Sequence, residues 1–231
     1  MGDVYAIIPA KSNNEELHNR NLREIKGVPL VGIAVRQALN SEKIDHVVVN
    51  TESEEISDVA ENYGAEVSDR PSRFTKSDRF MEVDRLLAWQ LDQLESDGAD
   101  IDAIVLLYPT CPLRTINIID RAVEKVADEG YDSALTLYED NRYLWKREED
   151  QVTPTNYDPQ KRAPHQIEEW NQWVENKAVY VMSRETLLRT GCRLGGEIGF
   201  VEMPVHRSIS IDTPVDFKLA QFISEVDGAS W

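Results

Sequence analysis

The sequence predicts an α/β fold, a mostly parallel open sheet with helices on both faces. Short apolar runs of strand length alternate with longer stretches of helical periodicity along most of the chain. Two of the apolar runs end at a proline and then turn polar, as parallel strands do where they open into ligand loops. The 231 residues, 41% of them hydrophobic, suit a single domain spanning 1–231.

The first part of the chain alternates strands with helices. Apolar runs predict three buried strands, at residues 4–9, 46–50 and 65–67. Two helical faces lie between them, made by Val31, Ala34, Val35, Ala38 and Leu39 and then by Ile56, Val59, Ala60 and Tyr63. We expect Thr51 and Glu54 to form a capping box at the start of the second helix, and Gly64 to end it.

The same alternation continues toward the C-terminus. Strands are predicted at residues 103–108, 133–137, 174–182 and 200–203. Two further helical faces are made by Leu86, Leu87, Leu91 and Leu94 and by Ile119, Ala122, Val123 and Val126. Thr115 can cap the second of these helices, which ends near Gly130. Thr213 and Pro214 are expected at the N-cap and first position of the last helix.

Residues 139–173 break the pattern. This segment is polar, rich in Trp and Tyr, and interrupted by three prolines. A long irregular stretch within a domain is usually functional or part of an interface. We therefore expect a small extension that packs against a second copy of the chain through Trp145, Trp170 and Trp173.

The chain is strongly acidic, with 25 basic and 42 acidic residues and a formal charge of −17. Such a surface repels nucleic acid and anionic membranes, so we expect neither as a partner. We find no apolar run long enough to span a membrane, and the N-terminus does not resemble a secretory signal. Cys111 and Cys192 provide neither a disulfide framework nor metal-ligand spacing, so a cytoplasmic location is expected.

The two apolar runs that open into polar loops are residues 7–21, IIPAKSNNEELHNRN, and 106–114, LLYPTCPLR. The first loop contains Lys11, Arg20 and several small polar residues, which suit a triphosphate. It has neither a Walker A pattern nor G-x-G-x-x-G, so P-loop kinases and dinucleotide enzymes have no support. From these residues alone, a phosphate site and a solvated connection both remain open.

These segments resemble the signature regions of the acylneuraminate cytidylyltransferase family, enzymes that make CMP-activated acidic sugars. The first resembles I-P-A-R-G-G-S-K-G-I-x-x-K-N, with Ala10 and Asn21 retained, Lys11 in place of arginine and Arg20 in place of lysine. Ser12, Asn13 and Glu15 replace two glycines and a lysine of that pattern. The second resembles L-L-Q-P-T-S-P-L-R, with Thr110 retained, Cys111 in place of serine and Tyr108 in place of glutamine.

Other elements of the family pattern follow in order. Arg70-Pro71, followed by Asp78, resembles the family's segment beside the cytosine. Trp145-Lys146, the stretch around Arg162 and Glu175-Asn176 resemble elements that meet the acidic sugar. Residues 208–216, SISIDTPVD, resemble D-I-D-T-P-x-D, whose two leading aspartates bind Mg²⁺; here Ser210 replaces the first and Asp212 remains.

The resemblance implies a Mg²⁺-dependent homodimer that joins CTP to an acidic eight- or nine-carbon sugar and releases pyrophosphate, with a nucleotide-diphospho-sugar transferase type of fold. Lys11, Arg20 and Asp212 would be catalytic, with Asp212 as the metal ligand. The nucleotide would be bound by Ala10, Lys11, Asn21, Arg70, Asp78, Thr110 and Cys111. The sugar would be bound by Tyr108, Lys146, Arg162 and Asn176.

Two alternatives stay open at this stage. Glu15, Ser210 and Cys111 are also compatible with a non-catalytic relative that binds nucleotide or sugar. A transferase for a different nucleobase or sugar is the other. Because Tyr108 is bulkier and less polar than glutamine, we expect a deoxygenated acidic sugar, of the legionaminic or pseudaminic kind, to be preferred over one rich in hydroxyls.

Overall fold

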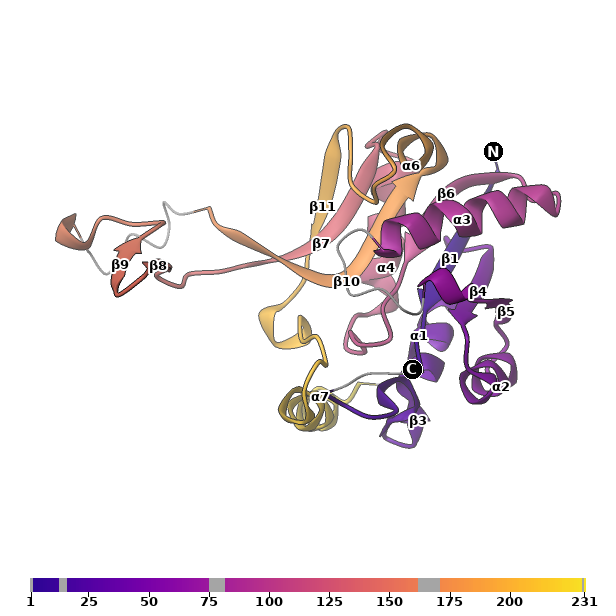
Figure 1. Ribbon diagram of the computed structural model, residues 1–231, viewed down its shortest axis with the longest axis horizontal. Coiled ribbons are helices and arrows are strands. Elements are labelled where there is room, and N and C mark those ends of the chain that lie inside the picture. Colours follow the sequence, from indigo (N-terminus) through magenta and orange to yellow (C-terminus); the bar gives the residue numbers. More distant parts are fainter. Residues whose placement is uncertain (1, 13–15, 75–81, 162–170, 230) are drawn as a thin grey trace.

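The computed structural model describes residues 2–12, 16–74, 82–161, 171–229 and 231. Its centre is a seven-stranded sheet in the order β11-β7-β10-β6-β1-β4-β5 (Figure 1). The strands are β1 (Asp3–Pro9), β4 (His46–Thr51), β5 (Glu66–Asp69), β6 (Ile101–Leu106), β7 (Ser133–Glu139), β10 (Trp173–Ser183) and β11 (Ile198–Glu202). Only β10 is antiparallel to its neighbours, which confirms the predicted mostly parallel sheet.

Helices cover both faces of this sheet, as predicted. Successive strand residues point to opposite faces. Ala6 and Ile8 of β1 therefore pack in one core, with α1 (Leu30–Leu39), α2 (Glu54–Asn62) and α4 (Ile116–Ala127). Tyr5 and Ile7 pack in the other, with α3 (Glu82–Ser96) and α6 (Arg184–Thr190).

The strand order reverses direction at β1. The chain runs from β1 to β4 and β5 on one side, and then crosses over to place β6 on the other side of β1. In open α/β sheets, ligands bind at the carboxyl ends of the strands where such a reversal occurs. The two polar loops of the sequence, after β1 and after β6, are therefore neighbours at this point.

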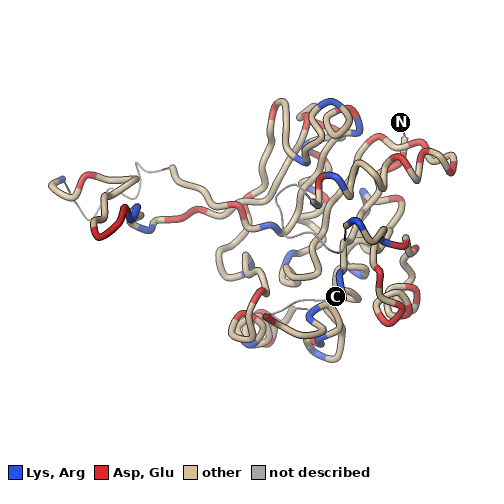
Figure 2. Tube along the Cα trace, viewed as in Figure 1, with Lys and Arg blue, Asp and Glu red and all other residues tan. Residues whose placement is uncertain are grey.

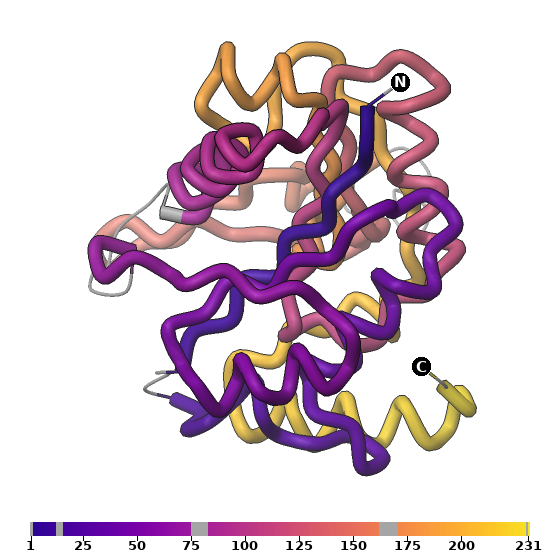
Figure 3. Tube along the Cα trace, turned by 90° about the vertical axis from the view of Figure 1, so that its right-hand side faces the viewer, coloured from indigo at the N-terminus to yellow at the C-terminus, as the bar shows by residue number. Residues whose placement is uncertain are grey.

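A third core cluster attaches the last helix to this edge. The helix α7 (Pro214–Val226) lies next to the segment that carries η1 (Arg20–Leu22), β2 (Glu24–Ile25) and β3 (Val28–Pro29) (Figures 1 and 3). Leu17 and Ile25 pack there with Leu113 and with Ile211, which precedes α7. This packing brings the loop before α7 to both polar loops.

Of the predicted extension at 139–173, the described residues 139–161 and 171–173 form an arm that contains regular strands. The strands β7 and β10 continue beyond the sheet as a paired ribbon that carries the hairpin β8 (Trp145–Glu148) and β9 (Gln151–Pro154), followed by η3 (Pro159–Lys161) (Figure 1). All of β8 and most of β9 are exposed, with an outward-facing Trp145. Trp173 begins β10, and Trp170 lies outside the described residues.

Three helix starts were predicted: Thr115 stands at the N-cap of α4 without a side-chain capping hydrogen bond, one of the others is corrected and one is confirmed. Thr51 does not cap α2, because β4 continues through it; Ser53 is the N-cap, and its hydroxyl accepts a hydrogen bond from the Ile56 amide at 3.4 Å. Thr213 forms the predicted cap of α7, in a full capping box with Asp216. Among the described residues, no helix is long and apolar enough to cross a membrane.

Candidate active site

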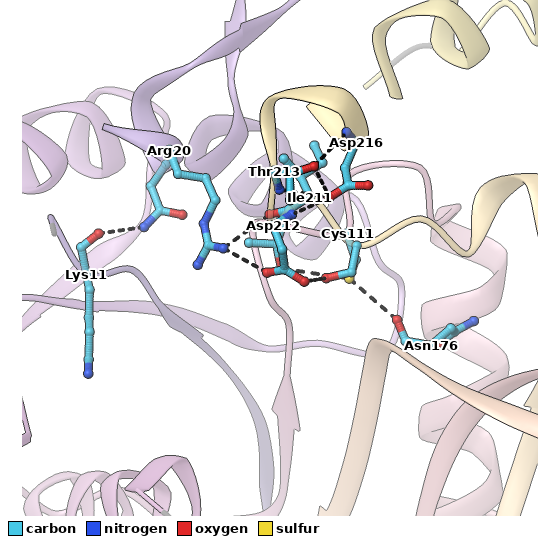
Figure 4. A network of polar contacts seen from close by, with 11 residues as sticks. Lys11, Arg20, Cys111, Asn176, Ile211, Asp212, Thr213 and Asp216 are labelled. Atoms are coloured by element: carbon cyan, nitrogen blue, oxygen red, sulfur yellow. Dashed lines mark hydrogen bonds and ion pairs between the residues drawn. The ribbon is translucent and has the colours of Figure 1, made fainter. Parts of the chain in front are cut away.

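The loop after β1 is pinned at both ends. The amide of the buried Ala10 donates to the carbonyl oxygen of Asn50 at 2.9 Å. The side-chain amide of Asn21, buried in η1, donates to the carbonyl oxygen of Lys11 at 2.8 Å. Asn21 therefore holds the loop, and the Lys11 side chain extends away from Arg20 (Figure 4). Asn13 and Glu15 lie outside the described residues.

Ser12 is fixed by the carboxylate of Glu52, which directly follows the neighbouring strand β4. Its amide and hydroxyl both donate to Glu52 Oε1, at 2.8 and 2.7 Å. Partial burial raises the pKa of Glu52, but the hydrogen bonds from Ser12 and the charge of Arg70 outweigh it and hold that pKa below its ordinary value. The carboxylate is therefore ionised and gives the mouth of the loop a fixed negative charge that sequence reasoning missed.

Arg20 and Asp212, the predicted phosphate and metal residues, are paired with each other (Figure 4). The Arg20 guanidinium donates to Asp212 Oδ1 at 2.9 Å and to the carbonyl oxygen of Ile211 at 3.2 Å. The other carboxylate oxygen accepts from the Ser210 hydroxyl at 3.3 Å. The amide of Ile211 donates to the carbonyl oxygen of Thr110 at 2.8 Å, which joins this loop to the loop after β6.

The start of α7 holds Asp212 in place without using its carboxylate. Asp216 accepts hydrogen bonds from the Asp212 amide at 3.2 Å and from the Thr213 amide and hydroxyl at 2.8 Å each. Burial raises the pKa of Asp216, but these hydrogen bonds outweigh it and lower that pKa overall. Asp216 is thus a capping residue, and Asp212 is the carboxylate left to face the site.

Arg114 organises the loop after β6. Its guanidinium is buried, and Nη1 donates to the carbonyl oxygens of Tyr108 at 2.7 Å, Cys111 at 2.9 Å and Ala178 at 3.3 Å. Burial lowers the pKa of Arg114 to about 10, so the group still carries its proton at neutral pH. One buried cation therefore sets the path of the predicted motif and fastens it to β10.

Thr110 and Cys111 of this loop lie beside Asn176 of β10, and all three are buried. The Cys111 thiol contacts the carbonyl oxygen of Asn176 at 3.6 Å, and burial raises its pKa, so it is no nucleophile. Asn176 Oδ1 accepts from the Thr136 hydroxyl at 2.6 Å, while Nδ2 donates to the Ser208 hydroxyl at 2.9 Å. Asn176, predicted to bind sugar, uses its side chain here to connect three segments of the protein.

Arg70 is buried at the carboxyl end of the neighbouring strand pair. Its Nε donates to Asn50 Oδ1 at 2.8 Å and its Nη2 to the Asn50 carbonyl oxygen at 3.2 Å. Asn50 is held in turn by Gln90 at 3.1 Å. The structure thus fixes Arg70 beside the first loop, where the resemblance expects the base. Asp78 lies outside the described residues.

Tyr108 belongs to a network that sequence reasoning did not find. Arg193 donates to the Tyr108 hydroxyl at 2.7 Å and to both oxygens of the buried Asp84, at 2.8 and 3.1 Å. The guanidinium also lies 5.3 Å from the centre of the Tyr180 ring, which meets Tyr108 edge to face. Burial raises the pKa of the Tyr108 phenol despite the Arg193 charge, so its hydroxyl is neutral.

Lys146 does not join this group within one chain. It lies on β8 in the arm, where its ammonium pairs with Glu148 at 2.7 Å (Figure 1). The β7–β10 ribbon carries Lys146 away from the sheet, so Lys146 and Tyr108 of one chain do not share a pocket. Arg162 lies outside the described residues.

The cations at the strand ends contrast with the rest of the surface. Figure 2 shows acidic residues spread over the described chain, in keeping with its formal charge of −17. Lys11, Arg20 and Arg70 nevertheless come from three elements to one edge of the sheet. This supplies the local positive charge that an anionic substrate needs in an acidic protein.

Asp212 is a carboxylate at this edge that could bind a divalent ion. Within the described ranges, no group of three or more His, Cys, Asp or Glu side chains could hold a metal alone. Mg²⁺ commonly takes one or two carboxylates and completes its shell with water and substrate phosphates. Asp212, with the Ser210 hydroxyl beside it, fits a site in which one protein carboxylate binds Mg²⁺ and water and substrate phosphates supply the other ligands.

Comparison with known proteins agrees with this geometry. The chain is 28% identical over 223 residues to N-acylneuraminate cytidylyltransferase A of Danio rerio, covering 94% of this chain and 50% of that protein. It is 26% identical over 236 residues to CMP-N,N'-diacetyllegionaminic acid synthase of Legionella pneumophila, covering 97% of each. The chain thus spans about half the length of the first relative and nearly all of the second.

Solved structures support the fold. A CMP:2-keto-3-deoxy-manno-octonic acid synthetase complexed with CTP matches with a TM-score of 0.66 at 12% identity, over 97% of this chain and 99% of that one. The family model described as cytidylyltransferase matches residues 5–190, a range that includes the first loop, Arg70 and the loop after β6. The chain belongs to the cytidylyltransferase family.

Proposed function

We propose that this chain transfers a cytidylyl group from CTP to an acidic sugar of the nonulosonic type, with Mg²⁺ and with release of pyrophosphate. One observation supports this most directly: the Arg20–Asp212 ion pair lies at the point where the strand order reverses, and Lys11 and Arg70 follow the carboxyl ends of β1 and β5 in the same sheet. The two relatives described above are named for acylneuraminic and diacetyllegionaminic acids, which are sugars of this class.

The residues at this edge suit the reaction. The sugar hydroxyl attacks the α-phosphorus of CTP, and the bond to the β-phosphate breaks as pyrophosphate leaves. Lys11 and Arg20 hold the phosphates and balance the charge that develops on them, while Arg70 faces the base. Mg²⁺ bound at Asp212 would neutralise phosphate charge and lower the pKa of the attacking hydroxyl. Asn21 and Arg114 keep the two loops in position.

Arg20 changes partner in this mechanism. In the structure it pairs with Asp212, at 2.9 Å. When a divalent ion occupies the carboxylate, the guanidinium is free to bind the triphosphate. The exchange keeps both charges paired before and after substrate binding, which limits the cost of holding them in a partly buried site.

Tyr108 is proposed to form one wall of the sugar pocket. Arg193 fixes its hydroxyl and Tyr180 supports its ring, so it presents a rigid, mostly apolar surface. Such a wall favours a deoxygenated sugar, of the legionaminic or pseudaminic kind, over N-acetylneuraminic acid. Tyr108→Gln should shift the ratio of kcat/KM values toward the hydroxyl-rich sugar. A ratio that this substitution leaves unchanged would remove Tyr108 from acceptor choice.

A homodimer would bring Lys146 to an active site. The arm carries Lys146 together with the exposed Leu144, Trp145 and Val152, a combination costly for a monomer to leave in water. We propose that the arm reaches the site of a second copy, where Lys146 meets the sugar carboxylate. Light scattering should give a dimer at micromolar concentration in low and high salt. A monomer in both conditions would contradict this assembly.

The decisive experiment is a pyrophosphate-release screen. CTP, UTP, GTP and ATP would each be combined with N-acetylneuraminic, legionaminic and eight-carbon keto-deoxy acids, with Mg²⁺ or with a chelator, at low and high salt. Release with CTP, an acidic sugar and Mg²⁺ is expected. If CTP binds by calorimetry but no combination releases pyrophosphate, the chain is a binding relative and the proposed activity is wrong.

A further inference from the structure

The last helix turns a second apolar face toward water. Val215, Leu219, Phe222 and Val226 of α7 are 72%, 46%, 62% and 68% exposed. The opposite face of the helix contains the buried Ala220 and Ser224 and packs on the third core cluster. The helix is thus apolar on two sides, and the fold of one chain covers only one of them.

The exposed residues have the spacing of a helix-pairing seam. They are four, three and four positions apart, so at 100° per residue they lie in one narrow stripe along the helix axis. An alternation of four and three is the a/d pattern through which two helices interlock side chains in a coiled coil. In Figure 1, α7 lies at the lower edge of the molecule and the arm projects to the side. This stripe is therefore a separate surface from the arm.

The charged residues beside the stripe favour a second copy of α7 as the partner, in an antiparallel orientation. Lys218 and Glu225 are exposed, seven residues apart, on the same side of the stripe. If a second α7 lies antiparallel across a two-fold axis, Leu219 meets Phe222 of the second copy and Val215 meets Val226. Lys218 of each copy then lies beside Glu225 of the other, which forms the charge pair twice. In a parallel pair the position facing Lys218 is Ile223, which offers no charge.

We propose that α7 is a self-association surface, which pairs antiparallel with α7 of a second copy of this chain through Val215, Leu219, Phe222 and Val226. A helix of 13 residues is about 20 Å long. The contact is therefore smaller than a standard stable interface, and the association is weak and reversible. If the arm also forms a dimer, pairing through α7 joins two such dimers. The proposal uses no catalytic residue and does not depend on the proposed function.

Sedimentation equilibrium over a range of concentrations tests it, at an ionic strength that screens the repulsion between two chains of charge −17. Phe222→Glu should weaken self-association at least tenfold. Leu188→Glu is the matched control, because Leu188 is a similarly exposed leucine (54%) on α6, away from the stripe. It should behave like the wild type. Circular dichroism and the melting temperature would verify that both variants fold.

A charge exchange tests the direction of pairing. Lys218→Glu and Glu225→Lys alone should each weaken association, because each places two like charges together twice. The double variant restores both pairs, keeps the net charge of the wild type and should recover wild-type association. Equal sedimentation of the wild type and Phe222→Glu would overturn the proposal. Failure of the double variant to recover would overturn the antiparallel arrangement.

Discussion

Asp212→Asn separates the catalytic role proposed for this residue from its structural one. The substitution keeps the size of the side chain and one oxygen acceptor, and it removes the charge that faces Arg20 and a divalent ion. The side chains of Arg20 and Asp212 are 20% and 51% exposed. A pair this accessible contributes at most about 1 kcal/mol, so the free energy of unfolding should fall by no more than that.

The effect on catalysis should be far larger. Loss of one group that stabilises developing charge typically lowers kcat by about 10²–10³. We therefore expect Asp212→Asn to lower pyrophosphate release at least about a hundredfold at limiting Mg²⁺. The assay is the initial rate of pyrophosphate release as a function of Mg²⁺ concentration, with urea unfolding measured on the same preparation.

Asp216→Asn is the matched control, four residues away. The Asp216 carboxylate accepts hydrogen bonds in the Thr213 cap. Its replacement should therefore lower the free energy of unfolding by about 1 kcal/mol and leave the dependence of the rate on Mg²⁺ unchanged. The two variants thus have opposite signatures. Full turnover of Asp212→Asn at limiting Mg²⁺, or an equal rate loss in Asp216→Asn, would refute the metal assignment.

Three further outcomes follow from the same contacts. Lys11→Ala and Arg20→Ala should each weaken CTP binding by about 1–3 kcal/mol in calorimetry, and unchanged affinity in the double variant would remove the first loop from the site. Arg114→Ala should lower the free energy of unfolding by at least about 3 kcal/mol in urea titrations, because three carbonyl oxygens lose their donor; a loss below about 1 kcal/mol would contradict its role. Since the pKa of Asp216 is lowered, its stabilising effect is complete above its ordinary value of 3.8 and is lost as the pH falls through the lowered pKa. The stability difference between the wild type and Asp216→Asn should therefore vanish in acid, and a difference that persists at the lowest pH would contradict this.

Local sequence patterns predicted the parts of the fold that depend on local physics. The apolar run of β1 and the Thr213 cap of α7 each need only neighbouring residues, and both are confirmed. The cap of α2 was wrong because Thr51 and Ser53 both have a suitable hydroxyl. Only the length of β4, which pairing with β5 extends through Thr51, decides between them.

The arm and the Tyr108 network could not be predicted from local sequence patterns, for a different reason. The residues of β8 are all exposed, so no alternation of burial marks this strand in the sequence. Arg193 lies 109 residues from Asp84 and 85 from Tyr108; Asp84 is on α3, Tyr108 follows β6 and Arg193 follows α6. Such a network arises from tertiary packing of the sheet edge against α3. Tyr108 was singled out only because it departs from the pattern that the chain resembles.

The pairing of Arg20 with Asp212 explains how an acidic chain can present a triphosphate site. An unpaired carboxylate at this edge would repel the nucleotide, and an unpaired guanidinium would remain costly in a partly buried position. In the proposed mechanism each neutralises the other until nucleotide and ion arrive, and then each binds one of the two. A single exchange that admits both ligands would couple their affinities, and each ligand would raise the affinity for the other by the same factor. The departures of this chain from the family pattern at Ser12 and Ser210 leave the exchange intact, since Ser12 is held by Glu52 and Ser210 donates to Asp212.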